Sequence, residues 1–325
     1  MAPAMSLAFD AYVTASLIDD DGQAVFALGS GQVAWERGAS QSAHAGAILC
    51  AIRHPRGGVI TGGDDGRLVW SRQDGTETLA QAPNRWIESR AGAPGATLIA
   101  YGAGREARVR DLADPGFERV FTHERSVADL AFDSKARRLA VATYGGAALW
   151  WARIADQKPV MLRWAGSHIG VAFSPDGKFL ISAMQENALH AWRLSDARDM
   201  RMGGYPSKVR SLAFLQGGKM LATAGANGVV IWPFSGADGP MGKSAAELAW
   251  DQTALVTRVA AEPDGAAIAA GLDDGRVRLL DARSDRVLEL KAEKGPPITA
   301  LTLGRGRVAW GDEQGGAGVA EVVAG

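Results

Sequence analysis

The sequence predicts an all-β fold, a single closed β-propeller built from four-stranded antiparallel blades. Three observations lead to this prediction. Short apolar runs alternate with Gly, Asp and Pro turns along the 325 residues, which include 41 glycines. The runs recur at intervals near the ~40 residues of one four-stranded blade. No segment carries the apolar stripe of period 3.6 that marks an amphipathic helix.

The repeat is clearest between residues 42 and 81. Apolar strands are expected at 48–52, 58–62 and 67–70. The turns Pro55-Arg56-Gly57 and Asp64-Asp65-Gly66 separate them, and both are rich in residues that favour tight turns. Three later units repeat this order and start from turns at 174–177, 216–218 and 263–265.

Eight such units predict eight blades. Their second strands align, at intervals of 35 to 47 residues, on Phe26, Thr61, Ala100, Val141, Ser182, Thr223, Ala270 and Trp310. Seven blades is the alternative, because the first interval is the shortest.

The last unit, Ile298 to Val323, supplies three strands and stops without a fourth. We expect the apolar segment 5–12 to provide the missing outer strand of that blade (298–323). The N- and C-terminal pieces would then lie side by side and close the ring, which removes an open strand edge. Residues 1–325 would form one domain.

The second unit holds a set of four polar and aromatic residues: His44 before the first strand, Thr61 on the second, Asp65 in the next turn and Trp70 on the third. In this set the chain resembles the WD40-repeat family of β-propellers, in a stand-alone form with degenerate repeats. The resemblance covers essentially the whole chain. It implies a structural tetrad in which carboxylate, imidazole, hydroxyl and indole satisfy one another.

Composition narrows the function classes. A net charge of −1 offers no basic face for nucleic acid. No apolar stretch approaches the length of a membrane span, and the first ten residues do not read as a secretory signal. The single cysteine, Cys50, fits a reducing compartment. We therefore expect a soluble, cytoplasmic, monomeric protein, and its Ala, Gly and Arg content is compatible with a bacterial source.

The sequence shows no recognisable set of residues for catalysis or metal binding. Residues 237–244 (ADGPMGKS) match a relaxed phosphate-loop pattern, but they lie between two expected strands and no helix follows. The five histidines have no zinc-site spacing. The acidic turns lack the calcium-loop pattern and are typical of hairpins. We therefore expect a protein that is not an enzyme, with no cofactor, no metal site and no catalytic residues.

The remaining candidates are loop residues. In propellers, the segments that enter each blade and the turns between its second and third strands gather on one face around the central channel. On the aligned register this face receives Arg85, Trp86, Arg105, Arg125, Tyr144, Trp164, Gln185, Tyr205, Lys208, Trp250 and Glu313. Trp, Tyr and Arg dominate binding hot spots, although aromatic residues also pack between blades.

The resemblance thus implies a non-enzymatic scaffold that binds a protein or peptide partner on this face. The alternative is a propeller enzyme, or a binder of a small ligand or metal, that uses the central channel. Glu88, Asp129 and Arg258 occupy equivalent first-strand positions that would lie near such a channel.

Overall fold

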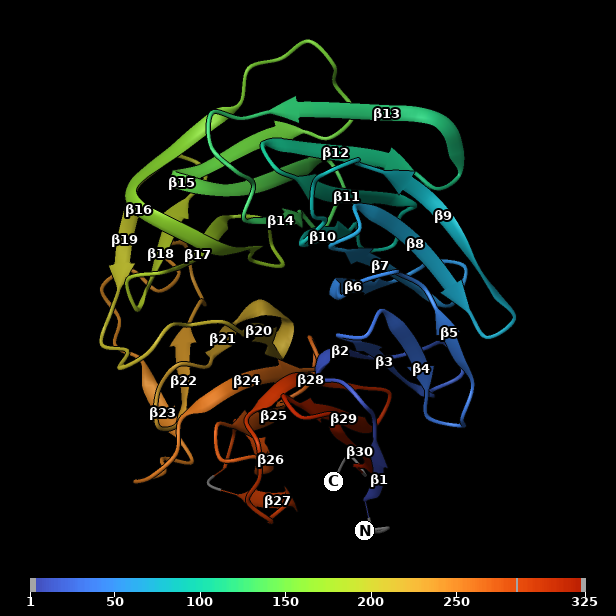
Figure 1. Cartoon of the computed structure of the whole chain (residues 1–325). Coiled ribbons are helices and arrows are strands. Elements are labelled where there is room, and N and C mark those ends of the chain that lie inside the picture. Colours follow the sequence, from blue (N-terminus) through green and yellow to red (C-terminus); the bar gives the residue numbers. More distant parts are fainter. Residues whose placement is uncertain (1–3, 285, 323–325) are drawn as a thin grey trace. The chain divides into compact units, whose positions relative to one another are not determined.

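The computed structural model describes residues 4–284 and 286–322. Residue 323, the expected end of the last blade, lies outside them, as do residues 1–3. The described chain forms β-strands and one short 3-10 turn, η1 (Gln216–Gly218), so the prediction of an all-β fold is confirmed. It divides into two compact units (Figure 1). Unit 1 comprises residues 1–42 and 205–325, and unit 2 comprises residues 43–204. No helix in the described part is long and apolar enough to cross a membrane.

Unit 2 contains three sheets, and consecutive strands pair antiparallel in each. The first sheet is β6 (Ile48–Arg53), β7 (Val59–Gly63), β8 (Arg67–Arg72) and β9 (Gly75–Gln81). The second is β10 (Ser89–Gly92), β11 (Leu98–Ala103), β12 (Glu106–Asp111) and β13 (Asp114–Thr122). The third has six strands: β14 (Asp129–Phe132), β15 (Arg138–Trp151), β16 (Val160–Phe173), β17 (Phe179–Met184), β18 (Ala188–Arg193) and β19 (Asp199–Met202).

Unit 1 contains four sheets of four strands. They are β2 (Val13–Ile18), β3 (Ala24–Leu28), β4 (Gln32–Trp35) and β5 (Ser40–Ser42); β20 (Leu212–Leu215), β21 (Met220–Thr223), β22 (Val229–Pro233) and β23 (Ala246–Leu248); β24 (Val256–Ala261), β25 (Ala267–Leu272), β26 (Val277–Asp281) and β27 (Val287–Lys291); and β28 (Ile298–Gly304), β29 (Arg307–Asp312), β30 (Gly316–Glu321) and β1 (Met5–Ala8).

The fourth sheet of unit 1 joins the two ends of the described chain. Its outermost strand is β1, which pairs antiparallel with β30 from Met5–Val319 to Ala8–Gly316 (Figure 1). The pairing covers an edge of β30 that would otherwise be open to another chain.

The described chain does not form eight separate sheets. Counted by hydrogen-bonded sheets the blades number seven, the alternative considered above, and one of them has six strands. The reason lies in β15 and β16, which have 14 residues each. Their hydrogen bonding continues across the expected boundary between two blades, so both blades belong to one sheet. Residues 139–142 of β15 pair with β14, whereas residues 146–149 pair with the first half of β16. The second half of β16 pairs with β17.

β15 folds back on itself at Gly145 and Gly146, whose φ angles are +89° and +138°. The N–H of Ala152 donates to the carbonyl of Arg137 at 2.8 Å, which closes a hairpin within this strand. An equivalent hydrogen bond closes the hairpin of the second and third strands in other sheets. In the second sheet, for example, the N–H of Leu112 donates to the carbonyl of Thr97.

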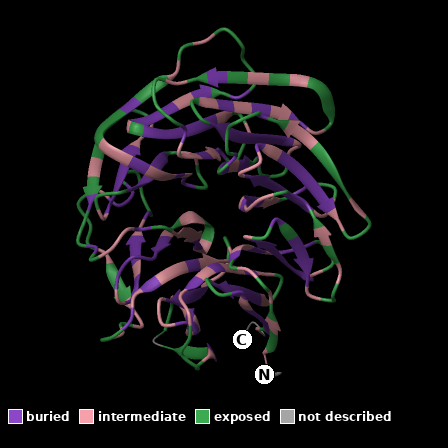
Figure 2. Ribbon diagram, viewed as in Figure 1, coloured by how far each residue is buried: buried purple, intermediate pink, exposed green. Residues whose placement is uncertain are grey.

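Within each unit, consecutive sheets pack face to face, and their first strands lie side by side. In unit 1 the hydroxyl of Thr299 donates to the carbonyl of Val13 at 2.7 Å, and that of Thr257 donates to Ile298 at 2.8 Å. Because the middle strands are covered on both faces, they read as continuous apolar runs: all five residues of β3 and all six of β11 are buried (Figure 2). Each unit is a run of propeller blades.

Candidate functional site

One end of the unit 2 blades brings together loops that are far apart in the sequence. In an antiparallel four-stranded blade, the turn after the second strand lies at the same end as the segment that enters the first. Hydrogen bonds join the two kinds of segment: Ile87 N–H to the carbonyl of Gly63 at 3.1 Å, and Val127 N–H to that of Gly104 at 2.8 Å. We call this end the turn face; it comprises residues 64–66, 82–88, 104–105, 123–128, 144–145, 164–167 and 185–187.

Seven of the eleven predicted partner-binding residues lie on the turn face: Arg85, Trp86, Arg105, Arg125, Tyr144, Trp164 and Gln185. All seven are exposed, and the most exposed aromatic side chains among them are Trp86 (61%) and Tyr144 (64%). The other four belong to unit 1. There, Trp250 and Glu313 are exposed, Lys208 is half-buried and Tyr205 is buried.

The guanidinium of Arg85 already forms an ion pair within the protein. Its guanidinium lies 3.0 Å from the carboxylate of Glu106, which also pairs with Arg108 at 2.8 Å. The hydrogen bond from Arg108, followed by that from Arg85, holds the pKa of Glu106 below its usual range. Arg85 therefore fixes the loop to the blade.

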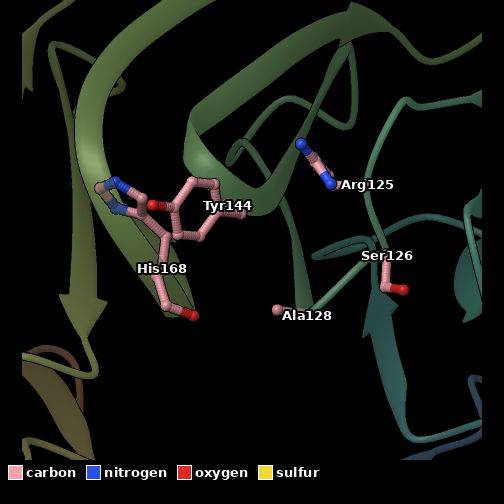
Figure 3. A pocket seen from close by; sticks show the side chains of 6 residues that line it. Arg125, Ser126, Ala128, Tyr144 and His168 are labelled. Atoms are coloured by element: carbon pink, nitrogen blue, oxygen red, sulfur yellow. The ribbon is translucent and has the colours of Figure 1, made fainter.

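A hollow of about 550 Å³ opens on the turn face (Figure 3). Tyr144 and His168 lie on one side of it, and Arg125 and Ser126 on the other, with Ala128 at the base of the view. Ser167 completes the lining. Two of these residues, Arg125 and Tyr144, were predicted. The two serines and Ala128 belong to no motif, so nothing in the sequence marks them.

His168 forms a fixed wall of the hollow. Its Nε2 lies 3.0 Å from the carbonyl of Trp164 and its Nδ1 lies 2.7 Å from the hydroxyl of Ser182. A carbonyl only accepts, so Nε2 carries the proton and Nδ1 accepts from Ser182. Burial lowers the pKa of His168 and keeps it neutral near pH 7. The ring of Trp164 in turn stacks on His190, with centroids 4.0 Å apart.

The expected tetrad forms only in part. His44 Nδ1 lies 2.9 Å from the carboxylate of Asp65, and Nε2 lies 2.8 Å from the hydroxyl of Thr61. The fourth member was assigned wrongly, because the indole of Trp70 donates to the carbonyl of Gly57 at 2.9 Å. Thr61 pairs with Val69 across the ladder, so Thr61 and Trp70 project from opposite faces of the sheet.

Tyr205, predicted as a contact for a partner, instead completes a buried network. Its hydroxyl lies 2.7 Å from the hydroxyl of Thr223 and 2.7 Å from the indole nitrogen of Trp232. Thr223 and Trp232 share a face here, because Trp232 pairs with Leu221, two residues from Thr223. The sequence could have indicated this role, because Tyr205 stands at nearly the same distance from its threonine as His44 does. Tyr205 precedes Thr223 by 18 residues, and His44 precedes Thr61 by 17.

His54 lies under the ring of Trp70, with centroids 3.9 Å apart, and is buried. Its Nδ1 accepts the N–H of Arg56 at 2.9 Å. Burial, together with the nearby charges of Arg56 and Arg72, lowers the pKa of His54 to about 4. The side chain is therefore neutral in the folded protein at pH 7.

We expect acid to destabilise the fold through His54. Between the unfolded pKa of about 6.5 and the folded value, the unfolded chain binds more protons, so the free energy of unfolding falls as the pH falls. The contribution is complete above about pH 7, and its loss by pH 4 is on the order of 3 kcal/mol. Urea denaturation between pH 4.5 and 7.5 measures it. His54→Phe keeps an aromatic ring against Trp70 and should flatten the profile, whereas an unchanged profile would contradict this role.

The chemistry-bearing groups outside the turn face are structural. Burial raises the pKa of the Cys50 thiol to about 11, and its Sγ lies 3.4 Å from the carbonyl of Ile87. Lys243 of the phosphate-loop-like segment donates to the carbonyl of Ser235 at 2.6 Å. Arg258 donates to the carbonyl of Thr299 at 2.7 Å. Among the described residues, no group of three His, Cys, Asp or Glu side chains is placed to hold a metal ion.

Comparison with known proteins identifies the fold. No protein-family model and no curated protein matches the chain. A solved structure does, that of the computationally designed Ika8 protein, with a TM-score of 0.79 over 97% of this chain and 98% of the designed one. The chain is a β-propeller. At 17% sequence identity the likeness concerns the fold alone.

Proposed function

We propose that this β-propeller is a non-enzymatic scaffold that binds a protein or peptide partner on the turn face. The observation that carries the proposal is the hollow between Arg125 and Tyr144. Among the described residues, no intramolecular hydrogen bond or ion pair occupies the side chains of Arg125, Ser126, Tyr144 or Ser167. These donors are therefore free to meet groups of a partner.

The surroundings of the hollow support this function. The exposed aromatic side chains of Trp86, Tyr144 and Trp164 lie on the same face as Arg105 and Arg125. Within the described part of the chain, neither guanidinium has a counter-ion. Large aromatics and arginine supply most of the binding energy in protein interfaces. The loops that carry them are tied to strand ends by backbone hydrogen bonds, so little entropy is lost when a partner docks.

The finer architecture belongs to the same proposal. The chain is a WD40-type propeller, and its six-stranded sheet supplies two blades, which gives eight. One blade is β14, the two halves of β15 and the first half of β16; the other is the second half of β16 with β17–β19. The His44–Thr61–Asp65 trio and the Tyr205–Thr223–Trp232 network support the family. The reduced Cys50 fits a monomer that works in the cytoplasm.

The test compares captures from the lysate of the native cell. Immobilised wild type should retain a partner that the double variant Trp86→Ala/Arg125→Ala loses at least tenfold, because both hot-spot side chains are removed. Trp151→Ala is the matched control. Trp151 is 51% exposed, but it lies at the end of β15 away from the turn face, so its loss should leave capture unchanged.

Circular dichroism confirms that the variants fold, and metal analysis of the same preparation checks the other function class. Equal capture by all three proteins would contradict a docking site on the turn face. A stoichiometric metal in the wild type, with no partner captured, would favour a channel enzyme instead.

A further inference from the structure

We infer that the hollow on the turn face recognises a side-chain carboxylate of its partner, next to an apolar side chain in an extended peptide segment. This inference rests on the proposed function and specifies its ligand chemistry. The group that carries it is Arg125, whose exposed guanidinium lines the hollow without a counter-ion among the described residues. A guanidinium offers two parallel N–H donors that match the two oxygens of a carboxylate.

The other free polar groups of the hollow are hydroxyls, which can also donate hydrogen bonds. The hydroxyls of Ser126, Tyr144 and Ser167 have no hydrogen-bond partner within the described chain, although Ser167 uses its backbone N–H to bind Glu186. His168 offers nothing further, because Ser182 and the carbonyl of Trp164 occupy both ring nitrogens. The guanidinium of Arg125 only donates and the hydroxyls can donate as well, so a ligand that accepts hydrogen bonds satisfies the hollow better than a donor does.

Charge favours an anion with one negative charge. Among the described residues, Arg125 is the only cation in the lining of the hollow. One carboxylate, that of Glu186, is bonded to the lining residue Ser167. Glu186 accepts the N–H of Ser167 at 3.1 Å, which places its carboxylate beside the lining. A doubly charged phosphoryl group would meet this carboxylate with a single guanidinium to balance its charge, whereas a carboxylate is matched one to one by Arg125.

We expect an apolar side chain in the partner peptide because exposed aromatic rings lie beside the hollow. Tyr144, which lines one side of the hollow, is 64% exposed. Trp164 is held next to the wall by its carbonyl bond to His168 and by the stack on His190. An extended peptide places consecutive side chains on alternate sides, so a carboxylate at Arg125 leaves a nearby side chain to cover one of these rings.

The probe is a phage library of random twelve-residue peptides, selected on the purified full-length wild type and on two variants. Arg125→Gln removes the charge from the hollow. Arg137→Gln removes the same charge from an exposed arginine in the turn before β15, at the end of the sheet away from the turn face, and is the matched control. Selected peptides are then synthesised with their Asp or Glu, with the corresponding amide, and with phosphoserine at that position.

We expect peptides enriched in Asp or Glu at one position next to an apolar residue. Their affinity should fall at least tenfold for Arg125→Gln and less than twofold for Arg137→Gln. The amide peptide should bind wild type tenfold more weakly and lose nothing further on Arg125→Gln, which shows that the two groups contact each other.

Contrary outcomes separate this inference from the proposed function. Peptides that bind the wild type without acidic enrichment, or equal losses for both variants, would overturn the carboxylate site and leave a peptide-binding face standing. Tighter binding of the phosphoserine peptide would overturn the preference for a single charge. Recovery of no binding peptide from the library would count against both.

Discussion

Gly146→Ala should lower the free energy of unfolding by about 3 to 4 kcal/mol. A Cβ at Gly146 would overlap the carbonyl oxygen of Leu162 in the paired first half of β16, and backbone has little room to move. The φ of +138° adds strain for any residue that carries a side chain. Equilibrium denaturation in guanidinium chloride measures the loss.

Gly145→Ala is the matched control for this prediction. The neighbouring glycine also has a positive φ, +89°, but a Cβ there would meet nothing within 4 Å. We expect a loss of about 1 kcal/mol from backbone strain alone. Equal losses for the two variants would mean that the chain does not fold back tightly at this turn, and the wall that carries Tyr144 would then need another account.

Tyr205→Phe should lower the free energy of unfolding by about 2 to 3 kcal/mol. The indole of Trp232 only donates, so it donates to the hydroxyl of Tyr205, which in turn donates to Thr223. Burial raises the pKa of Tyr205 to about 12, so the hydroxyl stays protonated in this role. The substitution keeps the ring but leaves the indole N–H of Trp232 without its acceptor and removes one of the two partners of the Thr223 hydroxyl.

Tyr12→Phe is the control for the same chemical change. Tyr12 is 42% exposed, and no hydrogen bond of its hydroxyl is found within the described residues, so its free energy of unfolding should change by less than about 0.5 kcal/mol. Urea denaturation of both variants at pH 7 gives the comparison. A loss below 1 kcal/mol for Tyr205→Phe would show that water replaces the missing hydroxyl.

Much of the blade pattern was predictable because it is local. The turn at Asp64–Gly66 and the alternation of short apolar runs fix where strands begin and end, and the structure has β7 and β8 on either side of that turn. The trio His44, Thr61 and Asp65 was also predictable, because its members stand at fixed distances along one blade. The number of sheets was not, since it depends on how the ladder continues through β15 and β16.

The candidate site was predictable in part for the same reason. Arg125 and Tyr144 were found because the blade register places them at the ends of strands. Their neighbours Ser126 and Ser167 are ordinary polar residues, and only the packing of two successive segments brings them to one hollow. Tyr205 was assigned to the surface because its class of side chain occurs both in interfaces and in cores.

The all-β class, the turns and the approximate blade interval could be predicted without the structure, because they follow from short-range preferences of glycine, aspartate and apolar runs. The sheet face on which each side chain lies depends instead on how the strands pair in the folded chain. A turn of different length shifts the ladder by one residue and moves a side chain to the opposite face, as it does for Trp70 against Thr61. The hydrogen bonds of Trp70, Trp232 and Tyr205 follow from that register. The register depends on the pairing of whole strands and cannot be deduced from any single residue.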